Sequence, residues 1–189
     1  MGTYRYEVEI LHLLVSPAHA YFGRARDGAA DVPTTDADTV EVVGGKGIVG
    51  DRFFGKAAHM DAAVTLFAIE SLEAIAAELG AGPFDPLLTR RNVVLRGAQL
   101  APLLGHDFAL ESGGDVVRFH GGRHAQPCAW MNGMLAPGAH PAMRGRGGIR
   151  CRAVSGGLLH RGPAMLVSPV PLDPARAGEP SLLRPSRLP

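Results

Sequence analysis

The chain has 189 residues, of which 46% are hydrophobic and 20% charged, and its formal net charge is +1. This length and composition fit one soluble globular domain with its own core. The small net charge disfavours a general nucleic-acid binder, and no apolar run approaches the ~18 residues that a membrane span needs. Two cysteines do not make a disulfide framework and the start lacks a secretory signal, so we expect a cytoplasmic protein that binds neither nucleic acid nor membrane.

The predicted elements in the first part of the chain are strands separated by a long loop. Residues 6–15 and 38–51 are expected to form strands, the second because Val40 and Val42 alternate with polar neighbours. Residues 16–38 are polar and rich in turn formers, which predicts a long loop of the kind that is often functional. The segment "AAVTLFA" is a further strand candidate.

One amphipathic helix follows, over 69–79. Apolar residues recur on one face at helical spacing, and Gly80 supplies a C-terminal stop. Short segments bounded by turn residues come next and are predicted to be strands: 90–97, 106–113, 115–121, 149–157 and 164–170. Many short strands with few helices indicate a mostly β fold, a barrel or a sandwich. We expect one domain over 1–170 and a proline-rich C-terminal extension, irregular or mobile, over 171–189.

Cys128 is a candidate reactive residue in the stretch "GGRHAQPCAW". It follows Arg123 and His124 and precedes "AWMNGML", which predicts a short helix. Pro127 suits the first position of such a helix, where the helix dipole and the cationic neighbours would favour the thiolate. The alternative is a small buried hydrophobic residue, as free cysteine often is. Cys151, inside a predicted strand, is expected to be structural.

The glycine-rich segment "GKGIVGDRFFG" over 45–55 is a second candidate. Its glycines permit tight turns or close approach to a ligand, and a turn would present Asp51 and Arg52. A hairpin with a surface ion pair is the alternative. The segment is not a phosphate-binding P-loop, because the Gly-Lys-Ser/Thr ending is missing.

Paired arginines form a third candidate in "TRRNVVLRG". Arg90 and Arg91 precede a predicted strand, and Asn92 can both donate and accept hydrogen bonds. Arginine grips phosphate or carboxylate through bidentate hydrogen bonds. Solvated charges at a strand end are the alternative.

The charges of the second half are strongly one-sided. No acidic residue occurs between Asp115 and Asp173, and this stretch holds four histidines and seven arginines. Such a surface suits an anion, unless acidic residues of the first half fold against it. The arginines are Arg118, Arg123, Arg144, Arg146, Arg150, Arg152 and Arg161.

Five segments occur together in one order, and as an ordered set they resemble the MOSC domain. This module is found at the C-terminus of molybdenum cofactor sulfurases and in free-standing bacterial proteins. The resemblance covers about residues 6–168. The segments are "GIVGDR" (47–52), "TRRNVVLRG" (89–97), "LLGHDFAL" (103–110), "QPC" (126–128) and "GRGGIRCRAVSGG" (145–157).

The resemblance implies a MOSC-type β-barrel, mostly β with a few helices, that binds the molybdenum cofactor (molybdopterin), an anionic pterin carrying a phosphate and a dithiolene-bound metal. It implies that Cys128 is the catalytic cysteine and the protein's ligand to molybdenum, or a relay for sulfur. Arg91 and Asn92 match the Arg-Asn pair at the family's ligand site. Asp51 and Arg52 match its Gly-Asp-Arg signature.

Two further arginines complete the expected cofactor site. Arg123 and Arg150 belong to the acid-free stretch, which suits a phosphate-bearing pterin, and a soft thiolate suits molybdenum or sulfur. The sequence departs from the family pattern at two places. Phe53 stands where Gly-Asp-Arg is often followed by histidine, and Pro163 follows Gly162 where relatives often have an acid.

The resemblance implies a stand-alone MOSC protein that either reduces N-hydroxylated compounds or carries sulfur or sulfurated cofactor, so its status as an enzyme stays open. The chain has no aminotransferase-like, haem or flavin module, and either role therefore implies an electron-donor or sulfurase partner. One alternative is a non-catalytic β-barrel that binds a phosphorylated metabolite or a protein partner, with Cys128 inert. Another is a cysteine hydrolase using Cys128 and His124, for which no orienting Asn or Asp is evident.

Overall fold

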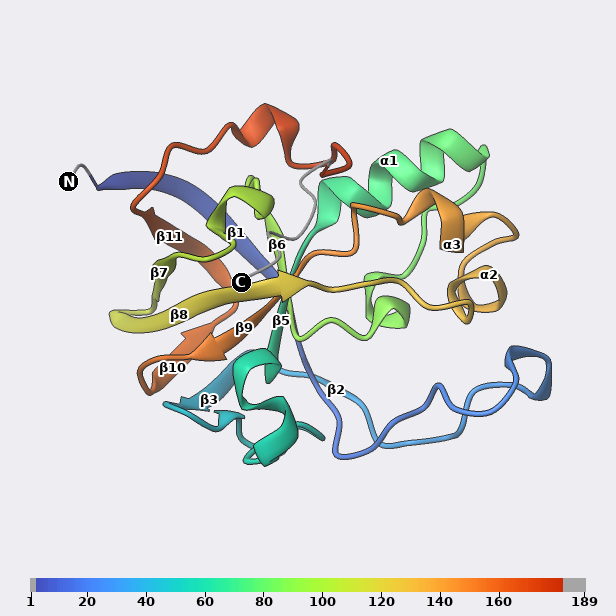
Figure 1. Ribbon diagram of the computed structural model, residues 1–189, viewed down its shortest axis with the longest axis horizontal. Helices are drawn as coiled ribbons and strands as arrows, with labels where there is room; N and C mark the ends of the chain where they lie inside the picture. The colour runs from blue at the N-terminus through green and yellow to red at the C-terminus, as the bar shows by residue number, and fades with distance from the viewer. Residues whose placement is uncertain (1–2, 182–189) are drawn as a thin grey trace, which may run out of the picture.

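Seven strands close a barrel within residues 3–181, the part of the chain that the computed structural model describes (Figure 1). Around the barrel the order is β1, β11, β7, β8, β9, β5, β6 and back to β1. β5 and β6 run parallel, and the other neighbours are antiparallel. The bounds are β1 (Tyr4–Val15), β5 (Val64–Ala68), β6 (Val93–Arg96), β7 (Asp107–Ser112), β8 (Asp115–His124), β9 (Ile149–Ala153) and β11 (Gly162–Ser168).

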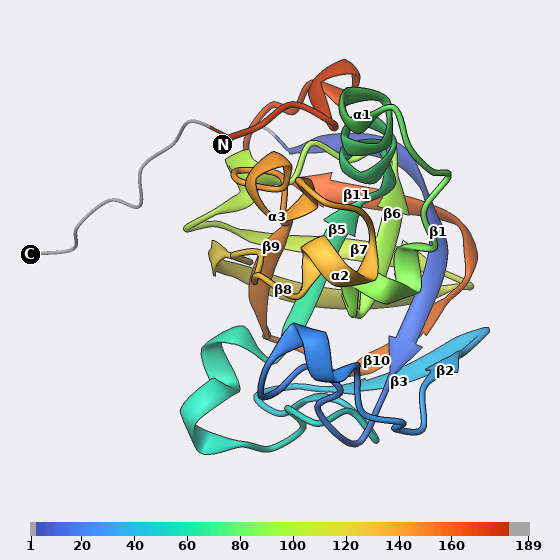
Figure 2. The ribbon, with the colours of Figure 1, turned by 90° about the vertical axis from the view of Figure 1, so that its right-hand side faces the viewer.

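A smaller three-stranded sheet lies at one end of the barrel (Figure 2). It consists of β3 (Thr39–Val43) between β4 (Gly47–Ile48) and β10 (Gly157–His160). A two-residue strand, β2 (Thr35–Asp36), extends the barrel sheet by pairing with the end of β1.

The barrel core follows from the alternation of side chains along the strands. In β1, buried Val8 and Ile10 alternate with exposed Glu7 and Glu9. Successive side chains of a strand point to opposite faces, so one face fills the barrel and the other meets water. The mostly β, barrel-like fold expected from the sequence is therefore confirmed.

α1 (Ile69–Leu79) follows β5 without a loop and is the longest helix in the described part of the chain. Its residues Ile69, Leu72 and Ile75 are buried against the barrel side, as the periodicity predicted. Gly80 ends the helix with a φ of 60°, a left-handed conformation that glycine adopts at little cost.

Two one-turn helices, α2 (Met131–Met134) and α3 (Ala139–Ala142), lie beside α1 on one flank of the barrel (Figures 1 and 2). Trp130 and Met143 join them to α1 in a second hydrophobic cluster. The described residues also form 3₁₀ turns: η1 (Ala25–Asp27), η2 (Ala57–Ala62), η3 (Pro86–Thr89), η4 (Ala101–Leu103) and η5 (Pro174–Arg176).

The described part of the predicted C-terminal extension, 171–181, contains the 3₁₀ turn η5 and packs on the barrel. Leu172 and Ala177 are buried in the barrel's core cluster. The N–H of Leu172 donates to the Tyr6 hydroxyl at 2.6 Å, and that of Ser181 donates to the Gly145 carbonyl at 2.9 Å. The rest of the predicted extension, 182–189, lies outside the described residues. From residue 3 to 181, no helix has the length and apolar character needed to cross a membrane.

Candidate functional site

Cys128 is exposed in an irregular segment between β8 and α2. The predicted short helix exists, but it begins at Met131, whose N–H donates to the Cys128 carbonyl at 3.0 Å. Pro127 is therefore not its first residue, and the thiol lies ahead of a single turn, where a helix dipole is small. Cys151 is fully buried in β9, and burial raises the pKa of its thiol, which agrees with a structural role.

Arg91 lies two residues before the first residue of β6 and is buried, in contact with the segment that carries Cys128. Its Nη2 donates to the carbonyl oxygens of Ala125 at 3.4 Å and Gln126 at 3.3 Å, while its Nε is buried without a partner among the described residues. Burial, and then the charge of Arg150, lower the pKa of Arg91 from 12.5 to about 10, against an opposing effect of Cys128. Arg91 is therefore charged at neutral pH, and Cys128 is close enough to interact with that charge.

Asn92 and Asp51 form a hydrogen-bonded network inside the protein. The Asn92 amide donates to Asp51 Oδ2 at 3.0 Å and to the Leu14 carbonyl at 3.2 Å, and its Oδ1 accepts from the N–H and hydroxyl of Thr65. Asp51 also accepts from the N–H of Phe53 at 3.1 Å. Both side chains are buried and engaged with protein groups. This geometry favours a positioning role, in which Asp51 and Asn92 hold the arginines next to them in sequence, Arg52 and Arg91.

Four arginines, of which Arg91 lies near Cys128, are close enough to interact, with the carboxylate of Asp51 among them. Arg52 pairs with Asp51 at 3.2 Å, and its Nη2 donates to the Arg90 carbonyl. Burial is the main cause that lowers the pKa of Arg52, Arg90 and Arg150. The positive charges of Arg90 and Arg150 lower the pKa of Arg52 further, and that of Arg123 lowers the pKa of Arg150. Arg52, Arg90, Arg91 and Arg150, hereafter the arginine cluster, thus carry an uncompensated positive charge that an anion would stabilise.

Arg90 ties the long loop to this cluster. Its Nη2 donates to the Ser16 hydroxyl and the Ala18 carbonyl, both at 2.8 Å, and its Nη1 donates to the Thr34 hydroxyl at 3.2 Å. Its φ of 54° is a left-handed conformation that is rare for a residue other than glycine. The predicted loop over 16–38 is thereby fixed at both of its ends.

An aromatic pair that the sequence did not reveal borders the cysteine. Tyr21 of the long loop stacks on Trp130 with ring centroids 5.3 Å apart, and its hydroxyl donates to the Leu88 carbonyl at 2.7 Å. The guanidinium of Arg90 lies over the Tyr21 ring at 5.7 Å. Burial raises the pKa of Tyr21, and Cys128 contributes to the rise, so the two side chains are near each other.

The acid-free stretch of arginines divides into two groups. Arg146, Arg152 and Arg161 form ion pairs with acids of the first half of the chain, as the alternative interpretation predicted. The other four have no ion pair within residues 3–181, and of these Arg150 belongs to the arginine cluster and Arg123 is its neighbour. The unpaired arginines are Arg118, Arg123, Arg144 and Arg150.

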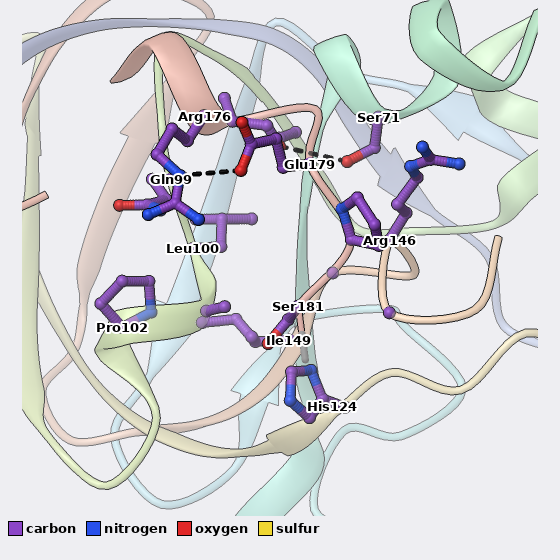
Figure 3. Close-up of a pocket in the computed structure, with 16 residues that line it drawn as sticks. Ser71, Gln99, Leu100, Pro102, His124, Arg146, Ile149, Arg176, Glu179 and Ser181 are labelled. Atoms are coloured by element: carbon purple, nitrogen blue, oxygen red, sulfur yellow. Dashed lines mark hydrogen bonds and ion pairs between the residues drawn. The ribbon is translucent and has the colours of Figure 1, made fainter. Parts of the chain in front are cut away.

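A further cavity lies apart from this site. It has a volume of about 520 Å³ and is bordered by His124, Ser71 and Gln99, with Arg146 and Arg176 at its rim (Figure 3). Neither Cys128 nor Arg91 lines it. Both rim arginines pair with glutamates, so the cavity offers little free charge.

His124 faces that cavity, and its Nε2 is buried without a hydrogen-bond partner in the described structure. No hydrogen bond between His124 and Cys128 occurs within residues 3–181, and no carboxylate or amide orients the imidazole there. This arrangement gives no support to a cysteine hydrolase, because that chemistry needs a base in contact with the thiol.

The site lacks the donors for a metal bound by protein alone. Among residues 3–181, no group of three or more His, Cys, Asp or Glu side chains lies together. Cys128 can therefore supply one ligand to a metal whose other ligands come with a cofactor. The uncompensated arginine cluster and the orphaned Nε of Arg91 fit the anionic part of such a cofactor.

The chain belongs to the MOSC domain family, whose sequence pattern matches residues 43–165. The crystal structure of the YuaD protein from Bacillus subtilis is similar, with 18% identity, a TM-score of 0.64, and 88% of this chain and 97% of that chain covered. The crystal structure of YiiM from Geobacillus stearothermophilus is 18% identical, with a TM-score of 0.58, and the match covers 84% of this chain and 74% of that one. The crystal structure of YiiM from Escherichia coli is also 18% identical, with a TM-score of 0.52, and the match covers 88% of this chain and 71% of that one. No curated protein matches the chain. At these identities the structural likenesses establish the fold alone.

Proposed function

We propose that the protein binds the molybdenum cofactor at Cys128, with the anionic pterin held by the arginine cluster. The observation that carries this proposal is the buried, charged Arg91 beside an exposed cysteine, with no carboxylate partner in the described structure. A buried cation without a partner costs several kcal/mol and is retained where it meets an anion. Membership of the MOSC family supports the molybdenum cofactor as that anion.

Each side chain would have a distinct role. Arg91 and Arg150 would bind the phosphate, with Arg123 at the rim, and Arg52 would be held in place by its ion pair with Asp51. Asn92 would hold the segment of Arg91 in place, just ahead of β6, through its bonds to Thr65 and Leu14. Cys128 would supply a thiolate to the metal, and the metal supplies two-electron chemistry when bound.

Two roles remain open for the loaded protein. As a reductase it would cleave the N–O bond of an N-hydroxylated compound, which consumes two electrons and two protons and releases water, and an electron-donor protein would be its partner. As a carrier it would hold a sulfur atom on Cys128 or pass on the cofactor, and a sulfurase would be its partner. Both cysteines are free, as in a reducing compartment, and a cytoplasmic location is part of the proposal.

The test is cofactor content in protein purified from hosts that can and cannot make the cofactor. We expect molybdenum and pterin to copurify in about equal amounts from the competent host. Arg91→Ala removes charge-assisted contacts worth roughly 1.5–3 kcal/mol and should weaken pterin binding by about one to two orders of magnitude. Cys128→Ser supplies a harder, poorly ionised oxygen and should lose metal and activity more completely than pterin.

A matched control is Arg118→Ala, because Arg118 is exposed and unpaired in the described structure. Its cofactor content should equal that of the wild type. If Arg91→Ala keeps full occupancy, or if Cys128→Ser keeps full activity, the roles proposed for these residues are wrong. Binding of a phosphorylated metabolite without molybdenum, unaffected by Cys128→Ser, would favour the non-catalytic alternative.

A further inference from the structure

A second group of basic side chains surrounds a hollow beside the long loop. The hollow has a volume of about 470 Å³ and lies between the start of the long loop and η2. In Figure 2 this loop and η2 lie together at the end of the barrel that also carries β3. The lining side chains that matter are His19, Arg52, Phe53, Lys56 and His59. This volume falls in the range of about 300–1,000 Å³ that is typical of small-molecule sites.

A buried aromatic ring fixes the two histidines of this hollow. Phe53 is 6% exposed, and the His19 and His59 rings meet it edge-on, with centroids 5.2 and 4.9 Å away. The guanidinium of Arg52 lies over the same ring at 4.8 Å. The imidazoles and the guanidinium are therefore held by packing, which lowers the entropy lost when a ligand binds.

No acid lines the hollow. Asp51, the acid next to it in sequence, points into the protein, where its oxygens accept hydrogen bonds from Phe53, Asn92 and Arg52. Lys56 has no ion pair within residues 3–181. The Nδ1 of His59 is buried and has no hydrogen-bond partner in the described structure. The hollow thus combines the unpaired charge of Lys56 with an imidazole that has an unsatisfied nitrogen.

We propose that this hollow binds the phosphate group of an anionic ligand, at a second site that shares only Arg52 with the arginine cluster. Lys56 and His59 donate hydrogen bonds to the phosphate oxygens, since each of these side chains can donate and neither has a carboxylate within the hollow to compete. Arg52, which stays paired with Asp51, adds its positive charge to the wall of the hollow. The volume leaves room for an organic group attached to the phosphate, with Phe53 and the imidazole rings as its wall.

The two lysines of the chain give a direct test. Lys46 and Lys56 are both exposed, and only Lys56 lines the hollow. Each lysine is modified with a water-soluble amine reagent and followed by mass spectrometry, with and without inorganic phosphate. At a concentration about ten times Kd, phosphate should slow the modification of Lys56 roughly tenfold by mass action and leave that of Lys46 unchanged. Unchanged modification of Lys56, or equal protection of both lysines, would overturn the proposal.

Variants give a second test through calorimetric titration. Lys56→Met keeps the stem of the side chain and removes its charge, so phosphate affinity should fall by about tenfold. Lys46→Met is the matched control and should bind as the wild type does. Wild-type affinity in Lys56→Met would contradict the proposal even if Lys56 is protected by phosphate.

Two comparisons separate this site from the one at Cys128 and identify the source of the phosphate. Cys128→Ala and Arg91→Ala should keep phosphate protection of Lys56, and its loss in Arg91→Ala would merge the two sites and refute a separate one. Phenyl phosphate that binds more tightly than inorganic phosphate indicates an organic phosphate ester as the ligand, whereas equal affinity indicates the free anion. Failure to copurify with molybdenum would refute the proposed function and leave this site intact.

Discussion

The guanidinium of Arg91 donates a hydrogen bond to the main-chain carbonyl of Gln126, two residues before Cys128, at 3.3 Å. This contact joins the residues just before β6 to the start of the segment that follows β8. A charged side chain thus holds the backbone that presents the thiol.

Arg91→Met should separate stability from function. Methionine fills a similar volume without burying a charge, and replacing a buried unpaired cation in this way is often stabilising. We expect the ligand-free variant to be about 1 kcal/mol more stable, which corresponds to a rise in Tm of roughly 2–4 °C for a chain of this size. Its cofactor content should drop sharply. A lower Tm in the ligand-free state would contradict the idea that Arg91 is retained for binding.

Cys128 should react with iodoacetamide before Cys151 in the folded protein. Cys128 is exposed, whereas Cys151 is fully buried and burial raises the pKa of its thiol. Mass spectrometry of timed samples follows each cysteine separately, and labelling in denaturant provides the control in which the two rates converge. Equal rates in the folded protein, or faster labelling of Cys151, would contradict the roles assigned to the two cysteines.

Asn92→Ala should destabilise the fold. The substitution leaves the buried carboxylate of Asp51 and the groups of Thr65 without their amide partner. Unsatisfied buried polar groups cost about 1–3 kcal/mol each, so the urea midpoint should shift clearly downward. Arg123→Ala, which removes an exposed side chain without an ion pair in the described structure, should leave that midpoint unchanged. A wild-type midpoint for Asn92→Ala would show that the network does not hold the site together.

The stability of the ligand-free protein should fall as the pH drops below about 6.5, the ordinary pKa of histidine. Burial is the main cause that lowers the pKa of His19, and the positive charges of Arg52 and Arg90 lower it further. His59 also lowers this pKa, whereas the negative charge of Asp51 raises it and offsets part of the effect. The unfolded chain then binds a proton more readily than the folded one, so protonation favours unfolding. His19→Asn should flatten this dependence in urea titrations at pH 5–7. An unchanged slope would exclude His19 as its source.

Sequence patterns predicted the main strands and the long helix of this fold better than the contacts of its candidate site. Alternation in β1 and helical spacing in α1 depend on which residues face the core, and both elements formed where the pattern predicted them. β10 was missed because Gly156 and Gly157 read as a turn, although Gly157 begins the strand.

The roles of individual site residues depend on contacts between distant parts of the chain. Asp51 and Asn92 have the composition of ligand-binding residues, and only the folded structure reveals that each engages the other. Tyr21 and Trp130 meet face to face from a loop and a turn that no local pattern connects. Cys128 and Arg91 could be proposed from sequence because the cationic neighbours of the cysteine and the pairing of Arg90 with Arg91 are local patterns.

The three hydrogen bonds of Arg90 have a consequence for how the rim of the site can change. Ser16 and Ala18 at the start of the long loop and Thr34 near its end are held by the same guanidinium. Residues 22–32, which lie between them, contain no buried side chain. Mutations, insertions or deletions in this segment therefore should not disturb the packing of the barrel. The rim can diversify to suit a new substrate or partner while every strand keeps its register.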